Sequence, residues 1–221
     1  MKKQIIIDND GGTDDFVAIL YAFLSKKFDI KGISLVAGNT DVNNVKENVF
    51  KALEMAGITV EEAKKIGVHL PERVNENIIS DGAQGDNGLG NVKYKKAFGY
   101  ELDMEQTAED KLISLVNNNP GQISIVATGP LTNIASAIDK DEDFVKNAKE
   151  IIIMGGDEEG GNITPYAEFN VYQDPEAAKK VFEAGFNKIV MIGFNIAEKI
   201  TFCPEVEKFL KDELASRTVF I

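Results

Sequence analysis

Short apolar runs alternate with amphipathic stretches along the chain, and this alternation constrains the fold more than any other feature. Between the runs, apolar residues recur at helical spacing, as at Phe16, Ile19, Leu20 and Phe23. The runs typical of buried strands lie at 3–7, 30–37, 123–127, 151–154 and 188–192. Because parallel strands need crossover connections, strands that alternate with helices form mostly parallel sheets. We therefore expect an α/β fold, a Rossmann-type, mostly parallel open sheet with helices on both faces.

The expected helices follow the strands closely in sequence. Asp174 and Pro175 form a typical helix start, with Asp as the cap and Pro in the first turn. We expect helices at 15–25, 42–56, 108–116, 131–138 and 175–184. Residues 58–97 are less regular, and the glycine-rich stretch 81–90 is typical of a long, functional loop. No linker or repeat interrupts the sequence, so we expect residues 1–221 to form a single domain.

Charge and apolar content exclude several classes of protein. The 221 residues include 24 basic and 36 acidic side chains, a formal net charge of −12. Such a surface repels nucleic acid and anionic membranes, so neither is an expected partner. No segment approaches the roughly 18 apolar residues of a membrane-spanning helix. The first apolar run is too short for a signal peptide, and the one cysteine, Cys203, fits a reducing compartment. We expect a cytoplasmic protein.

Four carboxylates within eight positions follow the first predicted strand, in the sequence DNDGGTDD at 8–15. We call this segment the acidic turn. If the strand stays extended, Asp8 and Asp10 point to the same face, while Asp14 and Asp15 fall in the first turn of the next helix. Carboxylates this close repel one another, and a bound cation would offset the repulsion. Oxygen ligands without His or Cys favour Ca²⁺ or Mg²⁺ over zinc.

Two other interpretations of the acidic turn stay open. The carboxylates of Asp14 and Asp15 could act as helix caps in a solvated loop, although this leaves Asp8 and Asp10 unexplained. An Asp-x-Asp pair after a first strand also occurs in haloacid-dehalogenase-like phosphatases. That family has a hydroxyl or small apolar residue where this chain has a glycine.

The acidic turn and several later motifs together resemble one known family. The matching segments, in chain order, are Asp8, Asp10, Gly12, Asp14 and Asp15, then VAGN at 36–39, ATGPLTNI at 127–134, MGG at 154–156, Asn162, AEFN at 167–170 and DPEAA at 174–178. In this order the motifs resemble those of the inosine-uridine preferring nucleoside hydrolases, from about residue 4 to 200. The resemblance implies a nucleoside hydrolase fold and Ca²⁺-dependent cleavage of ribonucleosides to free base and ribose, a salvage reaction.

The resemblance also implies roles for residues of the metal site. Asp10 is expected to be the general base that takes a proton from a water molecule bound to Ca²⁺. Asp10 and Asp15 are expected to ligate the metal, with the carbonyl of Thr128 as a further ligand. Metal coordination acidifies water, which compensates for the weak basicity of an aspartate. Asp8 is expected to support the loop rather than to contact substrate.

The ribose contacts follow from the same resemblance. Asp14, Asn39 and Asn170 are expected to hydrogen-bond the 2′ and 3′ hydroxyls, and Asn162 and Glu168 the 5′ hydroxyl. Carboxylates and amides suit this task because a sugar hydroxyl both donates and accepts. Asn39 could instead be a turn residue, and Asn162, Glu168 and Asn170 could be loop caps.

Three departures from the family pattern matter. Gly11 replaces a usual proline, and Gln84 stands where relatives commonly carry a histidine. Relatives are also expected to continue beyond this length, with a further Asp ligand and a His near their C-terminus. Neither His69, which we interpret as structural, nor Asp212, on an expected charged helix, matches that pair. The ending at Ile221 therefore looks like a chain cut short.

These departures leave two alternatives beside the hydrolase. One is a catalytically impaired relative that binds ribosides, and the other is a metal-dependent phosphatase. Family resemblance also implies a homodimer or homotetramer, with a ribonucleoside as the substrate.

Overall fold

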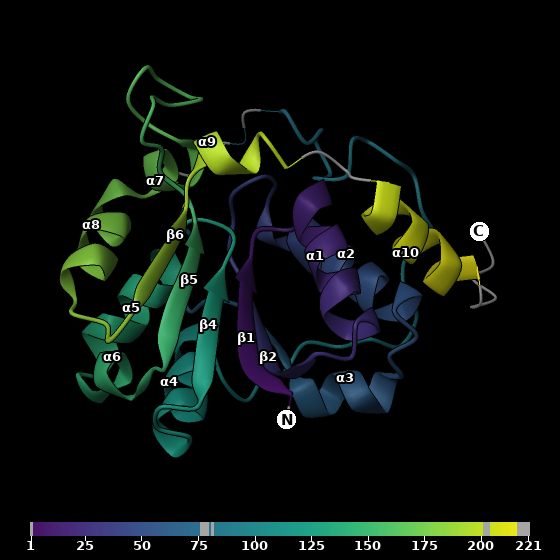
Figure 1. Ribbon diagram of the computed structural model, residues 1–221. Coiled ribbons are helices and arrows are strands. Elements are labelled where there is room, and N and C mark those ends of the chain that lie inside the picture. The colour runs from purple at the N-terminus through teal and green to yellow at the C-terminus, as the bar shows by residue number, and fades with distance from the viewer. Residues whose placement is uncertain (1, 76–79, 81, 201–203, 216–221) are drawn as a thin grey trace.

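In the computed structural model, which describes residues 2–75, 80, 82–200 and 204–215, six parallel strands form one open sheet (Figure 1). The sheet order is β3-β2-β1-β4-β5-β6. The strands are β1 (Lys3–Asn9), β2 (Phe28–Leu35), β3 (Val68–His69), β4 (Ile123–Ala127), β5 (Glu150–Met154) and β6 (Ile189–Ile192). The predicted parallel α/β fold is confirmed.

The helices connect the strands, as the apolar periodicity predicts. They are α1 (Thr13–Leu24), α2 (Val42–Met55), α3 (Val60–Ile66), α4 (Ala108–Asn118), α5 (Thr132–Lys140), α6 (Asp143–Asn147), α7 (Phe169–Gln173), α8 (Pro175–Glu183), α9 (Phe194–Ala197) and α10 (Pro204–Ala215). Asp174 caps α8 as expected, by accepting a bond from the amide of Ala177. The sequence prediction missed α3 and β3, which lie in the segment expected to be irregular, and it also missed the short helices α6, α7 and α9. A capping box between Thr59 and Glu62 begins α3.

Helices pack on both faces of the sheet (Figure 1). Successive side chains of a strand point to opposite faces. Ile5 and Ile7 pack in a core with apolar residues of α1, α2 and α3, whereas Ile6 packs in a second core with residues of α4, α5, α6 and α8. A run of three isoleucines therefore serves two cores, which explains why β1 is apolar at consecutive positions.

The strand order creates a switch point between β1 and β4. From β1 the chain builds outward to β2 and β3, and it then returns to add β4, β5 and β6 on the other side. Ligands of open parallel sheets bind beyond the carboxyl ends of the strands at such a point. The acidic turn follows β1 at this point, at the carboxyl ends of the strands, which lie toward α7 and α9 in Figure 1.

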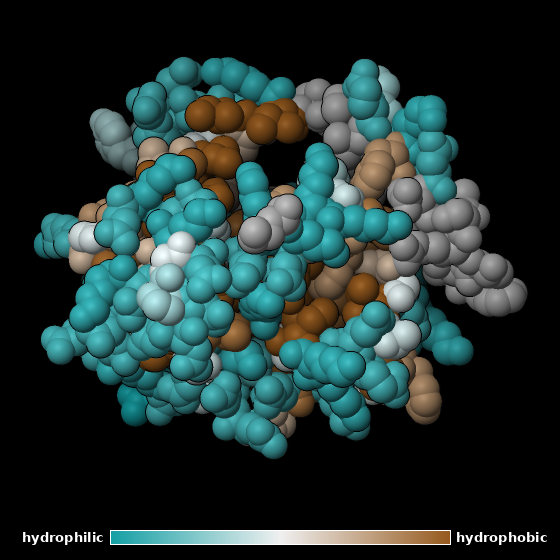
Figure 2. Space-filling view, turned by 60° about the horizontal axis from the view of Figure 1, so that its bottom comes forward, coloured by the Kyte–Doolittle hydropathy of each residue, from teal (hydrophilic) through white to brown (hydrophobic). Residues whose placement is uncertain are grey.

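The surface agrees with the acidic composition. The face in Figure 2 is mostly hydrophilic, with hydrophobic residues visible in limited areas between polar ones. Within the described ranges, no helix combines the length and the apolar character needed to cross a bilayer.

Candidate active site

Asp10 lies in a narrow slot at the switch point. A Cβ atom built on Gly38 would lie 2.1 Å from Asp10 Oδ2, and one built on Gly129 would lie 2.9 Å from Asp10 Cβ. These glycines follow β2 and β4, the two strands beside β1. Both carboxylate oxygens accept hydrogen bonds from Asn39, Oδ2 from its backbone N–H at 2.8 Å and Oδ1 from its side-chain amide at 3.0 Å. Asp10 is thus fully buried and held in one orientation.

Asp15 is the second buried carboxylate of the acidic turn. Its Oδ2 accepts the Gly12 backbone N–H at 2.9 Å, which completes the start of α1. Its Oδ1 accepts the Thr128 hydroxyl at 2.5 Å. The backbone N–H of Thr128 donates in turn to the Asp8 carbonyl at 2.9 Å. The tertiary structure therefore brings together Asp10, Asp15 and Thr128, the three residues that the family resemblance predicted as metal ligands.

The carboxyl pair carries an electrostatic strain that a cation would relieve. Burial raises the pKa of the Asp10 carboxyl from 3.8 to about 6. Burial also raises the pKa of Asp15 well above its ordinary value, and repulsion from Asp10 and Asp14 raises it further. The carboxyl groups of Asp10 and Asp15 lie within hydrogen-bonding reach of each other. A positive charge between them would favour the ionised form of both.

The donor atoms fit a hard divalent cation, but they supply only part of its coordination shell. Within the described part of the chain, no three His, Cys, Asp or Glu side chains are arranged to hold a metal ion. The set predicted from the sequence is two carboxylates and the Thr128 carbonyl. Calcium takes about six to eight oxygen ligands, so further oxygens must come from outside this set. The all-oxygen chemistry favours calcium or magnesium over zinc.

Asp8 is as fully buried as Asp10 and contacts other parts of the fold. Its Oδ1 accepts the Ser34 hydroxyl of β2 at 2.5 Å and the Asn133 amide of α5 at 2.8 Å. Its Oδ2 is buried without a partner within the described residues. Burial raises the pKa of this carboxyl from 3.8 to about 7. These contacts join β1, β2 and α5, which is the arrangement expected of a supporting residue.

Asp14 lies on the solvent side of the acidic turn, in the first turn of α1. The Gln84 side chain donates to its Oδ1 at 3.4 Å and accepts the Thr13 backbone N–H at 3.2 Å. Gln84 belongs to the glycine-rich stretch expected to be a functional loop, and the loop does reach the acidic turn. Asn39 is half-buried and its amide already serves Asp10, so its ribose contact stays a prediction.

The residues predicted to hold the 5′ hydroxyl have local partners of their own. Glu168 is the N-cap of α7 and accepts the Val171 N–H at 3.3 Å and the Gly156 N–H at 3.0 Å. Burial raises the pKa of the Glu168 carboxyl. Asn162 is exposed and accepts the Phe169 N–H at 2.8 Å. Both side chains therefore shape the loop before α7, which is the cap role that the sequence left open.

Asn170 joins the exits of β4 and β5. Its side-chain amide donates to the Thr128 carbonyl and to the Met154 carbonyl, each at 3.0 Å. A carbonyl oxygen has a second lone pair, so the Thr128 carbonyl can still accept a ligand. Asn170 thus fixes the orientation of a predicted metal ligand, and its contact with ribose stays a prediction.

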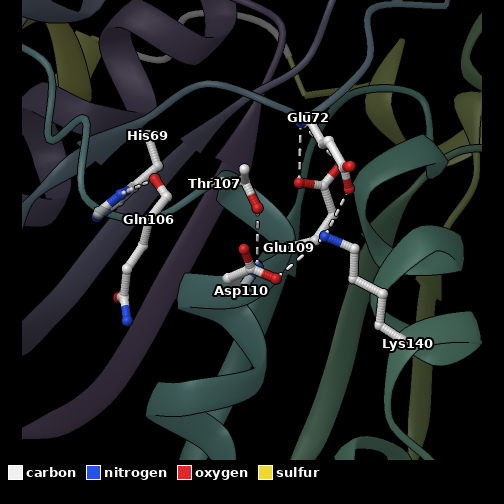
Figure 3. A network of polar contacts seen from close by, with 7 residues as sticks. All are labelled: His69, Glu72, Gln106, Thr107, Glu109, Asp110 and Lys140. Carbon is white, nitrogen blue, oxygen red and sulfur yellow. Dashed lines mark hydrogen bonds and ion pairs between the residues drawn. The ribbon is translucent and has the colours of Figure 1, made fainter.

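His69 lies on β3 in the interior of the fold, where it pairs with Ser34 of β2. Its Nδ1 lies 3.3 Å from the Gln106 carbonyl, and burial lowers its pKa, so the ring is neutral near pH 7. Figure 3 shows it beside a polar network in which the Glu72 backbone N–H donates to the Glu109 carboxylate and Lys140 bridges Glu72 and Asp110. The interpretation of His69 as a structural residue agrees with this burial.

Sequence reasoning missed the residues that hold the site in place. Gly38 and Gly129, which form the slot for Asp10, were noticed only as parts of longer motifs. Their position directly after two predicted strands, at 30–37 and 123–127, is a signal that could have found them. Ser34 and Asn133 contact the Asp8 carboxylate from 26 and 125 positions away in the sequence, so no local pattern marks these contacts.

The strand order and the buried carboxyl pair define the class of protein. It is an open-sheet α/β protein whose candidate ligand site, built of oxygen donors, lies at the switch point of the sheet. Comparison with known proteins gives the family. The sequence profile of the inosine-uridine preferring nucleoside hydrolases matches residues 5–219, and the chain belongs to this family.

Individual relatives agree with this assignment. A probable uridine nucleosidase 1 from Oryza sativa subsp. japonica is 36% identical over 92% of this chain and 62% of its own length. An inosine-uridine preferring nucleoside hydrolase from Leishmania major is 32% identical over 96% of this chain and 67% of its own. The solved structure of a plant nucleoside hydrolase matches with a TM-score of 0.81 and 37% identity over 90% of this chain and 62% of its own. The chain thus spans about three fifths to two thirds of these relatives.

Proposed function

We propose that the chain hydrolyses the N-glycosidic bond of ribonucleosides, with a bound calcium ion as cofactor. The observation that carries the proposal is the buried pair of Asp10 and Asp15 at the switch point, in a chain of this family. Structural ion pairs bring opposite charges together, whereas this pair brings two carboxyl groups out of water with no basic partner among the described residues. Perturbed acids of this kind occur most often at functional sites.

Asp10 has the properties of a general base. Cleavage of an N-glycosidic bond passes through an oxocarbenium-like state, so water must be activated beside the anomeric carbon. The Asp10 carboxyl is fully buried at the switch point, and a bound cation would keep it ionised and therefore able to accept a proton. Asn39 holds both oxygens, so the carboxylate does not have to reorganise when it accepts the proton of the attacking water.

The cation would be held by Asp10, Asp15 and the Thr128 carbonyl. When bound, calcium acidifies water and attracts the ribose hydroxyls. Asp14 lies exposed at the same turn, where its carboxylate can accept a hydrogen bond from a ribose hydroxyl. A preference for ribonucleosides over deoxyribonucleosides follows, because a deoxyribose lacks one of the hydroxyls to be held.

The test measures release of free base from uridine, inosine and deoxyuridine by the wild type and by Asp10→Asn. We expect the wild type to cleave the ribonucleosides in the presence of Ca²⁺. Asp10→Asn keeps the shape of the side chain and should lower the rate constant by at least about a hundredfold, the typical contribution of a general base. Calorimetry with CaCl₂ measures metal binding separately. Turnover by Asp10→Asn at the wild-type rate would contradict the mechanism.

The same assays distinguish the two alternatives. Binding of uridine without release of uracil would favour the riboside-binding relative. Release of inorganic phosphate from uridine monophosphate, with no release of base from uridine, would favour the phosphatase.

A further inference from the structure

The acidic turn contacts helix α2 through Gly11. Gly11 has a φ of +69°, and a Cβ atom built on it would lie 2.8 Å from Val45 Cα. The turn therefore passes directly over the backbone of α2. At this crossing the Gly11 carbonyl accepts a hydrogen bond of 2.8 Å from the side-chain amide of Asn48, one helical turn after Val45.

Asn48 is 1% exposed, and its side chain joins three separate segments. The Nδ2 atom donates to the Gly11 carbonyl and, also at 2.8 Å, to the Asn87 carbonyl. The Oδ1 atom accepts the hydroxyl of Tyr94. Both amide hydrogens and the amide oxygen are therefore engaged, and a carboxylate of the same shape could not replace them, because it has no N–H to donate.

The loop 84–90 approaches the acidic turn from the other side. Three successive carbonyls of this loop accept side-chain donors: Asp86 from Thr40 at 2.7 Å, Asn87 from Asn48 at 2.8 Å and Gly88 from Thr13 at 3.5 Å. A Cβ atom built on Gly88 would lie 2.9 Å from the Gly11 carbonyl oxygen. The loop and the turn are thus in direct contact.

We propose that Asn48 is a positioning residue that fixes the acidic turn and the loop 84–90 to each other as one unit. Through this unit the Gln84 side chain is kept at Thr13 and Asp14, and the Gly11 to Gly12 backbone is kept in the conformation that presents Asp10 and Asp15. The consequence for catalysis rests on the proposed function. The mechanical coupling of the two segments does not.

Hydrogen–deuterium exchange of the wild type and two variants tests the coupling. Asn48→Ala should speed amide exchange in residues 8–16 and in residues 84–92 together. Asn44→Ala is the matched control, because Asn44 lies on the same helix and donates to the Asp86 carbonyl at 3.2 Å, with no bond to the acidic turn. It should speed exchange in the loop and leave residues 8–16 unchanged. Faster exchange of only one segment in Asn48→Ala, or of neither, would overturn the proposal.

A second variant keeps the test decisive if Asn48→Ala does not fold. Tyr94→Phe removes the donor to Asn48 Oδ1 but keeps both bonds of the Asn48 amide. Without this donor the Asn48 amide is held less firmly, so exchange of residues 8–16 and 84–92 should both rise above the wild type. Unchanged exchange of residues 8–16 would overturn the proposal.

Calorimetric titration with CaCl₂ tests whether the coupling affects cation binding at the predicted metal site. Asn48→Ala should weaken Ca²⁺ binding about tenfold, equivalent to about 1.4 kcal/mol, and Asn44→Ala should leave it unchanged. Equal effects of the two variants would overturn the link to the metal site. If the wild type binds Ca²⁺ but cleaves no nucleoside, the proposed function fails while the exchange test of Asn48 still stands.

Discussion

Neutralising Asp8 should remove a large pH-dependent cost from the folded state. The Asp8 carboxyl is completely buried, and burial raises its pKa from 3.8 to about 7. The unfolded chain releases this proton near pH 3.8 and the folded chain near pH 7. Folding therefore favours the protonated acid, and the free energy of unfolding falls as the pH rises from about 4 to 7.

The size of the effect follows from the same values. One pKa unit corresponds to about 1.4 kcal/mol, so the ionised Asp8 carboxylate costs the folded state about 4 kcal/mol above pH 7. Between pH 5 and pH 8 the cost rises by about 3 kcal/mol. Asp8→Asn cannot ionise, yet its Oδ1 can still accept the bonds from Ser34 and Asn133. The variant should therefore gain about 3 kcal/mol relative to the wild type over this pH interval.

Urea unfolding at several pH values between 5 and 8.5 measures this gain. Both proteins are studied with excess chelator, so that no divalent cation binds the neighbouring carboxylates. Asp29→Asn is the control, because Asp29 is a partly exposed partner of Lys31 and a surface ion pair contributes little to stability. A constant difference between Asp8→Asn and the wild type from pH 5 to 8 would refute the reasoning.

The remaining predictions concern the slot and the metal site. Gly38→Ala should abolish turnover, because its Cβ would lie 2.1 Å from Asp10 Oδ2. Gly155→Ala is the control and should retain turnover, because a Cβ there would have no neighbour closer than 3.5 Å. Base release measures the activity of both variants and circular dichroism their folding, and equal activity would contradict the slot around Asp10. Thr128→Val should lower the calcium-free unfolding free energy by about 1.5 to 3 kcal/mol, since the Asp15 carboxylate loses its hydroxyl donor, and an unchanged urea midpoint would contradict this. Added calcium should raise the Tm more at pH 8 than at pH 5, because Asp10, with a pKa of about 6, must lose its proton to bind a cation. An increase in Tm that does not depend on pH would exclude the Asp10 carboxyl as a ligand.

Local pattern predicted most of the secondary structure. The strand at 123–127 and the start of the helix at 42 were predicted to the residue, because apolar periodicity and flanking polar residues are properties of neighbouring positions. The short α3 and β3 were missed. A strand of two residues carries no periodicity, and β3 is recognised only by its pairing with Ile33 and Ser34 of β2.

The sequence by itself determined the parallel α/β class and the cluster of carboxylates after the first strand, because each depends on residues close together in the chain. It also determined the family, because the family's motifs occur in order along the chain. Only the tertiary structure decided how that cluster is held. The slot around Asp10 needs Gly38 and Gly129 from two other strands, and the turn is tied to α2 by Asn48. Burial, which raises the pKa of Asp10, likewise appears only when the strands assemble, since the cost of removing a carboxyl from water depends on everything packed around it.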